Sequence, residues 1–437
     1  MARKPLDRDF TAQVTGLSHD GRGVAHRNGK AVFINGALPG ETVRAKQTGR
    51  SRHFDQASIL EVLEASEQRI DPQCAHYALC SGCVLQHLQP DQQLLAKQSV
   101  LVESLSRIGH VQAEQIFEPL RGPLWGYRRK GRFSVRWVDK KGKSLVGFRE
   151  ENPKFVADLS HCHTLVPQIG TRISALSSLI DQLEARASIP QIEFVVGDAA
   201  IALVIRHLQA LSIADRNVLI QFAKDSGFAL FLQPQGVESV HALWPAQVDL
   251  YFDLAKHNVR LHFRPLDFIQ VNAQLNEQMI DRALQLLQPT KTDRVLDLFC
   301  GLGNFTLPLA RQVAHIVGVE GDPGLIQRAN NNATANQIHN ARFYSADLSK
   351  PLNAEAWLQQ GFDKLLLDPP RAGAAEVLAQ LPLKAIQRIV YVSCHPASLA
   401  RDAGFLVRER GYRLLGAGVM DMFPHTAHVE SIAVFER

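Results

Sequence analysis

The chain has 437 residues, of which 46% are hydrophobic and 21% charged, and this excludes a single compact domain, a disordered protein and a fibrous repeat. Residues 1–10 are charged and lack an apolar stretch, and no segment approaches the roughly 20 apolar residues that cross a bilayer, so we expect a cytoplasmic protein. The net charge of +5 is a weak indication of a polyanionic partner, but the charge is unevenly distributed.

Residues 1–67 have the pattern of a small β-barrel. Short alternating segments are separated by turn pairs such as Asp20-Gly21 and Asn28-Gly29, which favours an OB-like barrel. The expected strands are Ala12–Leu17, Gly23–Ala25, Lys30–Ile34, Glu41–Gln47 and Ala57–Leu63. Residues 1–52 hold ten Lys or Arg against four acidic residues. This balance favours a nucleic-acid partner, although a basic surface can also serve solubility alone.

Residues 68–264 have the pattern of a central α+β domain with a second basic region. Gln191–Pro234 indicates a hairpin at Gly197-Asp198, a helix near Ala214–Asp225 and a strand over Phe228–Gln233. Residues 121–150 carry ten Lys or Arg against two acids. Five aromatic residues lie among them: Trp125, Tyr127, Phe133, Trp137 and Phe148. Phosphate neutralisation and base stacking are therefore available for RNA, while the alternative is that alternate aromatics face a core and the charges face water.

From about Leu266 onward, helices alternate with apolar strands. The expected strands are Arg294–Leu298, Ile316–Glu320, Ala341–Ser345, Lys364–Leu367, Arg388–Val392 and Ser431–Phe435. A βαβ series of this kind predicts a doubly wound α/β sheet, which we assign to residues 265–437.

A glycine turn follows the first of these strands, within Val295–Asn304. Gly301 and Gly303 let the backbone come close to a nucleoside, and Glu320 ends the next strand, where a carboxylate accepts ribose hydroxyls. These residues alone would fit NAD equally well. However, Thr306 replaces the third glycine of a dinucleotide site.

Acidic residues near several strand ends also argue against NAD. Asp297 precedes the glycines, where it would repel a pyrophosphate but suit the cationic methionine part of S-adenosylmethionine. Asp347 and Asp368 follow two further strands. We therefore expect S-adenosylmethionine as the cofactor.

A cysteine at a strand end is the candidate nucleophile. Cys394 follows an apolar strand, where the active sites of this fold gather. Carbon 5 of uracil is a poor nucleophile, and a thiolate that adds to carbon 6 would activate it. Glu430 is the carboxylate nominated to remove the carbon 5 proton afterwards. The alternative for Cys394 is a small buried residue, which is the interpretation kept for Cys300.

The remaining four cysteines form a candidate metal site. Cys74, Cys80 and Cys83 have the spacing C-x5-C-x2-C, and Cys162 follows much later between two histidines. Four thiolates could bind zinc or an iron–sulfur cluster; three local cysteines with one distant one favour [4Fe–4S], and zinc stays open as the alternative. It is not the C-x3-C-x2-C spacing of radical enzymes, so we do not expect radical chemistry.

Nearly the whole chain resembles the bacterial 23S ribosomal RNA (uracil-C5)-methyltransferases. Asp20–Val24 and Leu38–Glu41 are similar to their TRAM domain, which binds RNA, and Cys74, Cys80, Cys83 and Cys162 match the ligands of their [4Fe–4S] cluster. The resemblance implies that the catalytic pair is Cys394 and Glu430. It implies six S-adenosylmethionine contacts: Gln270, Phe299, Asn304, Glu320, Asp347 and Asp368. His395 departs from the usual Asn.

The resemblance also implies the substrate class. The tRNA-directed relatives lack the TRAM domain and the four cysteines, so we expect 23S rRNA as substrate. We also expect a monomer with no obligate protein partner. It implies that residues near 93–124 pack against the catalytic domain. The competing hypotheses are a methyltransferase acting on another rRNA or tRNA site and a non-catalytic RNA-binding factor for ribosome assembly.

Overall fold

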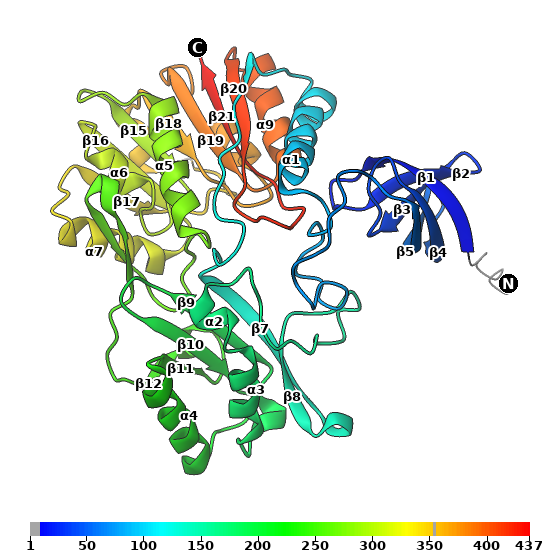
Figure 1. The fold of residues 1–437 in the computed structure, drawn as a ribbon. Coiled ribbons are helices and arrows are strands. Elements are labelled where there is room, and N and C mark those ends of the chain that lie inside the picture. The colour runs from blue at the N-terminus through cyan, green and yellow to red at the C-terminus, as the bar shows by residue number, and fades with distance from the viewer. Residues whose placement is uncertain (1–8, 353–354) are drawn as a thin grey trace. The chain divides into compact units, whose positions relative to one another are not determined.

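The computed structural model describes residues 9–352 and 355–437 (Figure 1). Residues 1–8, with which the expected barrel domain begins, lie outside the described residues. The chain divides into two compact units, one made of Met1–Val100 with Phe423–His428 and the other of Leu101–Met422 with Val429–Arg437. Among the described residues, no helix is both long and apolar enough to cross a membrane.

The first unit contains the expected five-stranded barrel, closed in the order β1-β2-β3-β5-β4. Its strands are β1 (Asp9–Leu17), β2 (Gly23–Arg27), β3 (Lys30–Asn35), β4 (Thr42–Arg50) and β5 (Phe54–Glu64). Alternate residues point inward, and several are alanines, including Ala25, Ala45 and Ala57, because a barrel this small has little interior volume. The closed barrel confirms the predicted fold of the N-terminal part.

A buried carboxylate ties the segment after the barrel to it. Glu41 is fully buried and accepts hydrogen bonds from the Leu38 backbone (2.8 Å) and from Arg69 Nε (2.5 Å). Burial alone would raise the pKa of Glu41, but the hydrogen bonds from Arg69 and Leu38 outweigh it and hold the pKa below its ordinary value. Arg69 also donates to the Gly36 carbonyl (2.7 Å), so it closes this junction. Helix α1 (Pro90–Ser104) follows further along the chain.

The second unit contains a six-stranded sheet in the order β12-β11-β10-β9-β7-β8. Its strands are β7 (Lys130–Val138), β8 (Lys143–Gly147), β9 (Gln191–Val196), β10 (Ile201–Arg206), β11 (Ala229–Gln233) and β12 (His241–Trp244). The helices of this part are α2 (Pro167–Gly170), α3 (Ile173–Asp181) and α4 (Ile213–Ser226). Ser212 caps α4 by accepting from the Asp215 backbone, and Gly227 ends it with a positive φ. This is the predicted central α+β arrangement.

The same unit contains an eight-stranded sheet in the order β17-β16-β15-β18-β19-β21-β20-β6 (Figure 1). Its strands are β15 (Arg294–Leu298), β16 (His315–Glu320), β17 (Ala341–Ser345), β18 (Lys364–Leu367), β19 (Arg388–Ser393), β20 (Arg413–Met420), β21 (Glu430–Glu436) and β6 (Gln115–Ile116). Strands β15 to β19 run parallel, whereas β21 is antiparallel to both of its neighbours. Its helices are α5 (Ala273–Leu287), α6 (Thr306–Ala310), α7 (Pro323–Ala335), α8 (Ala375–Gln380) and α9 (Pro396–Arg408). The predicted Rossmann-like sheet is confirmed.

A short segment before the central sheet joins this eight-stranded sheet. Gln115 and Ile116 of β6 pair with Gly416 and Ala417 of β20. The preceding π-helical turn, Leu105–Gly109, approaches α9 so closely that a side chain at Gly109 would meet the Ala400 carbonyl. Glycine is therefore required at this contact.

Candidate active site

The turn between β15 and α6 has an unusual backbone conformation. We call Phe299–Asn304 the cofactor turn. Phe299, Gly301 and Gly303 all have positive φ, at 64°, 55° and 97°. A Cβ atom placed on Gly301 would meet nothing within 4 Å, whereas one on Gly303 would press against Leu307. The backbone at Gly301 therefore borders open space, where a ligand can approach it closely.

Glu320 holds the cofactor turn from the end of the neighbouring strand. Its Oε2 accepts from the Gly301 backbone N–H (3.3 Å). Its Oε1 accepts from the N–H groups of Gly321 (2.7 Å) and Asp322 (3.1 Å). These bonds fix the carboxylate beside Gly301 and leave it able to accept further hydrogen bonds.

Asp297 lies in strand β15, directly before this turn, and is completely buried. Its Oδ2 accepts from Thr306 Oγ1 (2.5 Å), while its Oδ1 has no hydrogen-bond partner. Burial raises the pKa of Asp297 to about 8, and the negative charges of Asp368 and Glu320 add to this effect. Burial likewise raises the pKa of Asp368, which follows β18, to about 7. Carboxyl groups thus gather at one edge of the sheet, and their negative charge favours a cationic ligand.

Asn304 and Gln270 are each held by a residue distant in the sequence. The Asn304 amide donates to Asn276 (2.9 Å) and accepts from it (3.0 Å), so the two side chains form a reciprocal pair. The Gln270 carbonyl accepts from Arg129 Nε (3.0 Å). Arg129 is buried and its guanidinium stacks on the ring of Phe252, at 4.4 Å from the centroid. Part of the basic region therefore supports the loop that carries Gln270.

Asp347 lies on an exposed loop at the same sheet edge. The backbone N–H of Ala346 donates to the Glu320 carbonyl (3.0 Å), which places the loop next to β16. The Asp347 carboxylate accepts from Ser349 Oγ (2.6 Å) and pairs with Lys350 (2.9 Å). The hydrogen bond from Ser349 and, to a smaller extent, that from Lys350 lower the pKa of Asp347 to about 2. This carboxylate is engaged within its own loop.

Cys394 and Glu430 occupy adjoining ends of β19 and β21. Ser393 pairs with Ser431 in the antiparallel ladder, so Cys394, which follows Ser393, and Glu430, which precedes Ser431, lie at the same edge. Burial raises the pKa of Cys394 to about 11, the charges of Glu430 and Asp368 add to this, and Arg371 opposes it. These electrostatic effects show that the four groups are neighbours. In this arrangement the resting thiol is protonated.

Cys300 is the second thiol of this region, and its surroundings differ. It is buried within the cofactor turn, and burial, with Asp297 and Glu320, raises its pKa well above the ordinary value. A thiol in such a place is inert. Among the described cysteines none forms a disulfide.

His395, next to the candidate nucleophile, caps helix α9. Its Nδ1 accepts from the Ser398 backbone N–H (3.3 Å), in the manner of an N-cap side chain. Its own backbone N–H donates to Ser393 Oγ (3.1 Å). The imidazole therefore makes the capping bond that Asn makes at helix N-termini, directly beside Cys394.

A buried carboxylate connects helix α9 to the loop after Asp368. Asp402 accepts from the Ala374 backbone (2.7 Å), Tyr391 Oη (2.7 Å) and Arg401 Nε (2.8 Å). The loop it anchors is the one that carries Arg371. Nothing in the sequence indicated these hydrogen bonds, because Asp402 is an ordinary polar residue in an amphipathic helix.

The four remaining cysteines are divided between the two units. Cys74, Cys80 and Cys83 lie in the first unit within residues 70–89, which contain no helix or strand. Cys80 Sγ accepts from the Gly82 backbone (3.4 Å). Cys162 lies in the second unit, with its Sγ 3.2 Å from Thr164 Oγ1. Within the described part of the chain, no three His, Cys, Asp or Glu side chains are grouped as a metal site.

Comparison with known proteins identifies the class of protein that this fold and site define. A family model described as tRNA (Uracil-5-)-methyltransferase matches residues 91–437, and a TRAM domain model matches residues 8–48. The chain belongs to this family of S-adenosylmethionine-dependent RNA (uracil-C5)-methyltransferases, as its sequence predicted.

Individual relatives narrow the comparison. The chain is 62% identical to the 23S rRNA (uracil(1939)-C(5))-methyltransferase RlmD of Xanthomonas oryzae pv. oryzae (strain MAFF 311018), across 100% of this chain and 99% of that protein. It is 61% identical to the RlmD of Stenotrophomonas maltophilia (strain R551-3), with the same coverage. The crystal structure of Pyrococcus abyssi tRNA (uracil-54, C5)-methyltransferase in complex with S-adenosyl-L-homocysteine has a TM-score of 0.75, with 22% identity, over 97% of this chain and 99% of that one. This last likeness concerns the fold.

Proposed function

We propose that the protein transfers a methyl group from S-adenosylmethionine to carbon 5 of a uracil in 23S rRNA, uracil 1939. The observation that carries the proposal is the pair Cys394 and Glu430, which adjoin at the sheet edge that also bears Asp368. The position of the uracil is proposed from full-length relatives that carry it in their names.

In the proposed reaction the sulfur of Cys394 adds to carbon 6 of the flipped-out uracil, and the electron pair of the 5,6 double bond moves toward the carbonyl at carbon 4. Carbon 5 of this enolate then takes the methyl group, which S-adenosylmethionine supplies. Glu430 removes the proton from carbon 5, the double bond re-forms, and the carbon–sulfur bond breaks to release Cys394. Because the resting thiol is protonated, it must first release its proton to solvent water, which leaves Glu430 unprotonated for its later role, and the charge of Arg371 favours that release.

Six residues would hold S-adenosylmethionine, and two observations support the fit of this group. The space beside Gly301 is open, and Asp297 Oδ1 is a buried acceptor without a partner. We propose that Glu320 accepts the ribose hydroxyls and that the carboxyl group of Asp297 favours the charged methionine part. The full set is Gln270, Phe299, Asn304, Glu320, Asp347 and Asp368.

We further propose that Cys74, Cys80, Cys83 and Cys162 bind a [4Fe–4S] cluster. Four thiolates are the donor set that such clusters require, and three of them lie in a segment without regular structure that ligation would order. The cluster would be structural or hold RNA, since the methyl transfer needs no redox step. Iron and sulfide analysis of anaerobically purified protein tests this; a colourless, zinc-containing sample would overturn it. Cys83→Ser should lose the iron, while Cys300→Ser should keep it.

The domain assignment that accompanies this function has three parts. Residues 1–67 would bind RNA as the TRAM domain, residues 68–264 would carry the cluster, and residues 265–437 would perform the methyl transfer. A ribosomal RNA substrate would place the protein in the cytoplasm. We propose that it acts as a monomer, which light scattering of the purified protein would check.

The decisive experiment supplies labelled S-adenosylmethionine and protein-free 23S rRNA to the full-length protein. We expect one labelled 5-methyluridine, and we expect Cys394→Ala to bind S-adenosylhomocysteine while losing both methylation and the covalent RNA adduct. Substantial turnover by this variant would sink the mechanism. No transfer by the unaltered protein would favour the ribosome-assembly factor. Labelling of tRNA, or of another rRNA position, would assign a different substrate.

A further inference from the structure

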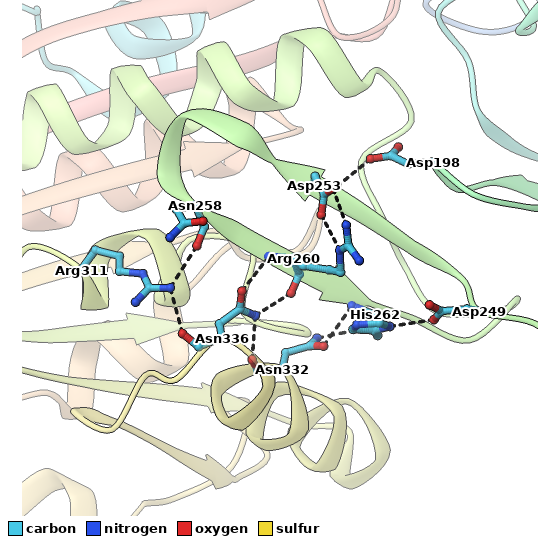
Figure 2. Close-up of polar contacts among 9 residues, drawn as sticks. All are labelled: Asp198, Asp249, Asp253, Asn258, Arg260, His262, Arg311, Asn332 and Asn336. Atoms are coloured by element: carbon cyan, nitrogen blue, oxygen red, sulfur yellow. Dashed lines mark hydrogen bonds and ion pairs between the residues drawn. The ribbon is translucent and has the colours of Figure 1, made fainter.

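A small hairpin is clamped onto helix α7 by two asparagines one helical turn apart (Figure 2). The hairpin consists of β13 (Tyr251–Leu254) and β14 (Val259–His262). Asn332 accepts from the His262 backbone N–H (2.9 Å) and donates to the His262 carbonyl (3.1 Å). Asn336 makes the same two bonds to Arg260, at 2.7 and 2.6 Å. Residues four apart share a helix face, so both amides meet the same strand edge.

Asn332 alone of this pair also reaches the cofactor turn. Its Nδ2 donates a further hydrogen bond, 3.3 Å long, to the carbonyl of Leu302. Asn336 is the C-cap residue of α7, and its corresponding bond goes to the carbonyl of Asn332 in the last turn of that helix (2.7 Å). Asn332 is 1% exposed, so this bond is made away from water. The two clamps therefore differ in one contact.

The Leu302 carbonyl belongs to the most adaptable part of the turn. It lies between Gly301 and Gly303, which both have positive φ angles, and glycine has access to many backbone conformations because it lacks a Cβ atom. Glu320 holds the turn on one side through the Gly301 N–H, and Asn332 holds it on the other through Leu302. Both belong to one β16–α7 unit.

The hairpin gives Asn332 a fixed anchor. Asp198, in the turn between β9 and β10, accepts from the Asp253 backbone N–H (2.7 Å), so the hairpin is tied on its other side to the central sheet (Figure 2). Arg311 additionally donates to the carbonyls of Asn258 (3.0 Å) and Asn336 (2.8 Å). The amide of Asn332 is therefore held from the hairpin side while it restrains the turn.

We propose that Asn332 is a positioning residue for S-adenosylmethionine: it fixes the Leu302 peptide and with it the conformation of the cofactor turn. The inference rests on the proposed function, which makes this turn the cofactor site. Asn332 is not expected to touch the cofactor itself. Its effect should appear in cofactor affinity and not in the chemistry of methyl transfer.

The test compares Asn332→Ala with Asn336→Ala in the full-length protein. Each variant loses its two hydrogen bonds to β14, but Asn332→Ala alone also loses the hydrogen bond to the Leu302 carbonyl. We expect Asn332→Ala to weaken S-adenosylhomocysteine binding by about fivefold to tenfold in calorimetry, and Asn336→Ala by less than about twofold. For Asn332→Ala the KM for S-adenosylmethionine should rise, while kcat and the KM for RNA stay near those of the unaltered protein.

Hydrogen exchange provides a readout independent of activity. The amides of residues 299–305 should exchange faster in Asn332→Ala and not in Asn336→Ala. Equal weakening by both variants would assign the effect to hairpin docking and overturn the proposal, as would unchanged binding by Asn332→Ala. Should that variant fail to fold, Asn332→Ser fills more of the site and carries the same expectation. Failure of the unaltered protein to bind S-adenosylhomocysteine would instead count against the proposed function.

Discussion

Cys394 and Glu430 adjoin across the antiparallel ladder of β19 and β21, one position beyond the pair Ser393–Ser431. The ladder thus fixes two groups that lie 36 residues apart in the sequence. Their proximity has an electrostatic consequence, since the negative charge of Glu430 helps to raise the pKa of the thiol. Glu430 would therefore disfavour the thiolate at rest and serve as the base later in the reaction.

Replacing Glu430 separates these two effects. Glu430→Gln removes a negative neighbour, so the pKa of Cys394 should fall and the pH profile of its alkylation by iodoacetamide should move to lower pH. Turnover should drop by about 10²- to 10⁴-fold, the range for loss of a general base. The covalent RNA adduct should accumulate on denaturing gels. An unchanged alkylation profile would contradict the proximity, and a missing adduct would indicate another base.

Asp297 should make the ligand-free protein less stable as pH rises. Its pKa is raised in the folded state to about 8, so between about pH 4 and 8 the folded protein binds more protons than the unfolded chain. Asp297 therefore destabilises the protein progressively through this window, by at most about 1.4 kcal/mol per pH unit. Asn keeps the acceptor for Thr306 and does not titrate. The melting temperature of Asp297→Asn relative to the unaltered protein should rise from pH 5 to pH 8; a constant difference would refute this account.

Asp402 should matter for both stability and turnover. Its carboxylate accepts three hydrogen bonds, and Asn would place an amide donor against one of these donors. Asp402→Asn should lower the free energy of unfolding by about 2–4 kcal/mol in urea titrations, and Tyr391→Phe by about 1 kcal/mol. Because Asp402 anchors the loop of Arg371, the former should also lower kcat for methyl transfer. Equal effects of the two changes on kcat would argue against a role of the anchor.

The basic region should divide into residues that bind phosphate and residues that hold the protein together. Arg136 is exposed on β7, whereas Lys130 donates to the carbonyls of Pro265 (2.8 Å) and Asp267 (2.7 Å), and burial lowers its pKa to about 8. Arg136→Ala should reduce the slope of log affinity for RNA against log salt concentration by about one. Lys130→Met should leave this slope unchanged. Filter binding over a potassium chloride series measures both slopes. A smaller slope for Lys130→Met would mean that this side chain contacts RNA.

The strands of the catalytic sheet were predictable because buried parallel strands are continuous apolar runs. β15 and β18 begin and end at the predicted residues, Arg294–Leu298 and Lys364–Leu367. Strand β20 was missed, since Gly416 and Gly418 weaken its strand pattern. Their bare backbone is covered by Phe117, with which a side chain at either glycine would collide. That contact is three hundred residues away in sequence, and no local pattern reveals it.

The candidate active site likewise combines residues that the sequence predicted with supporting residues that it did not. Glu320, Asp368 and Cys394 were placed at one sheet edge because parallel strands end together, and the structure has them there. Their supporting partners were not predicted. Arg129 belongs to the basic run that was assigned to RNA, and no sequence pattern singled out Asn332. Burial and hydrogen bonding across distant segments determine these roles, so periodicity and spacing contain no information about them.

The asparagine clamp on β14 also bears on self-association. A strand whose outer N–H and C=O groups are unpaired is a template on which another polypeptide can add a strand, and this is a route to aggregation. On β14 the outward backbone groups of Arg260 and His262 are taken up by the amides of Asn336 and Asn332. Side chains thus complete the ladder that a further strand would otherwise supply. The hairpin can remain two strands wide without recruiting a second molecule.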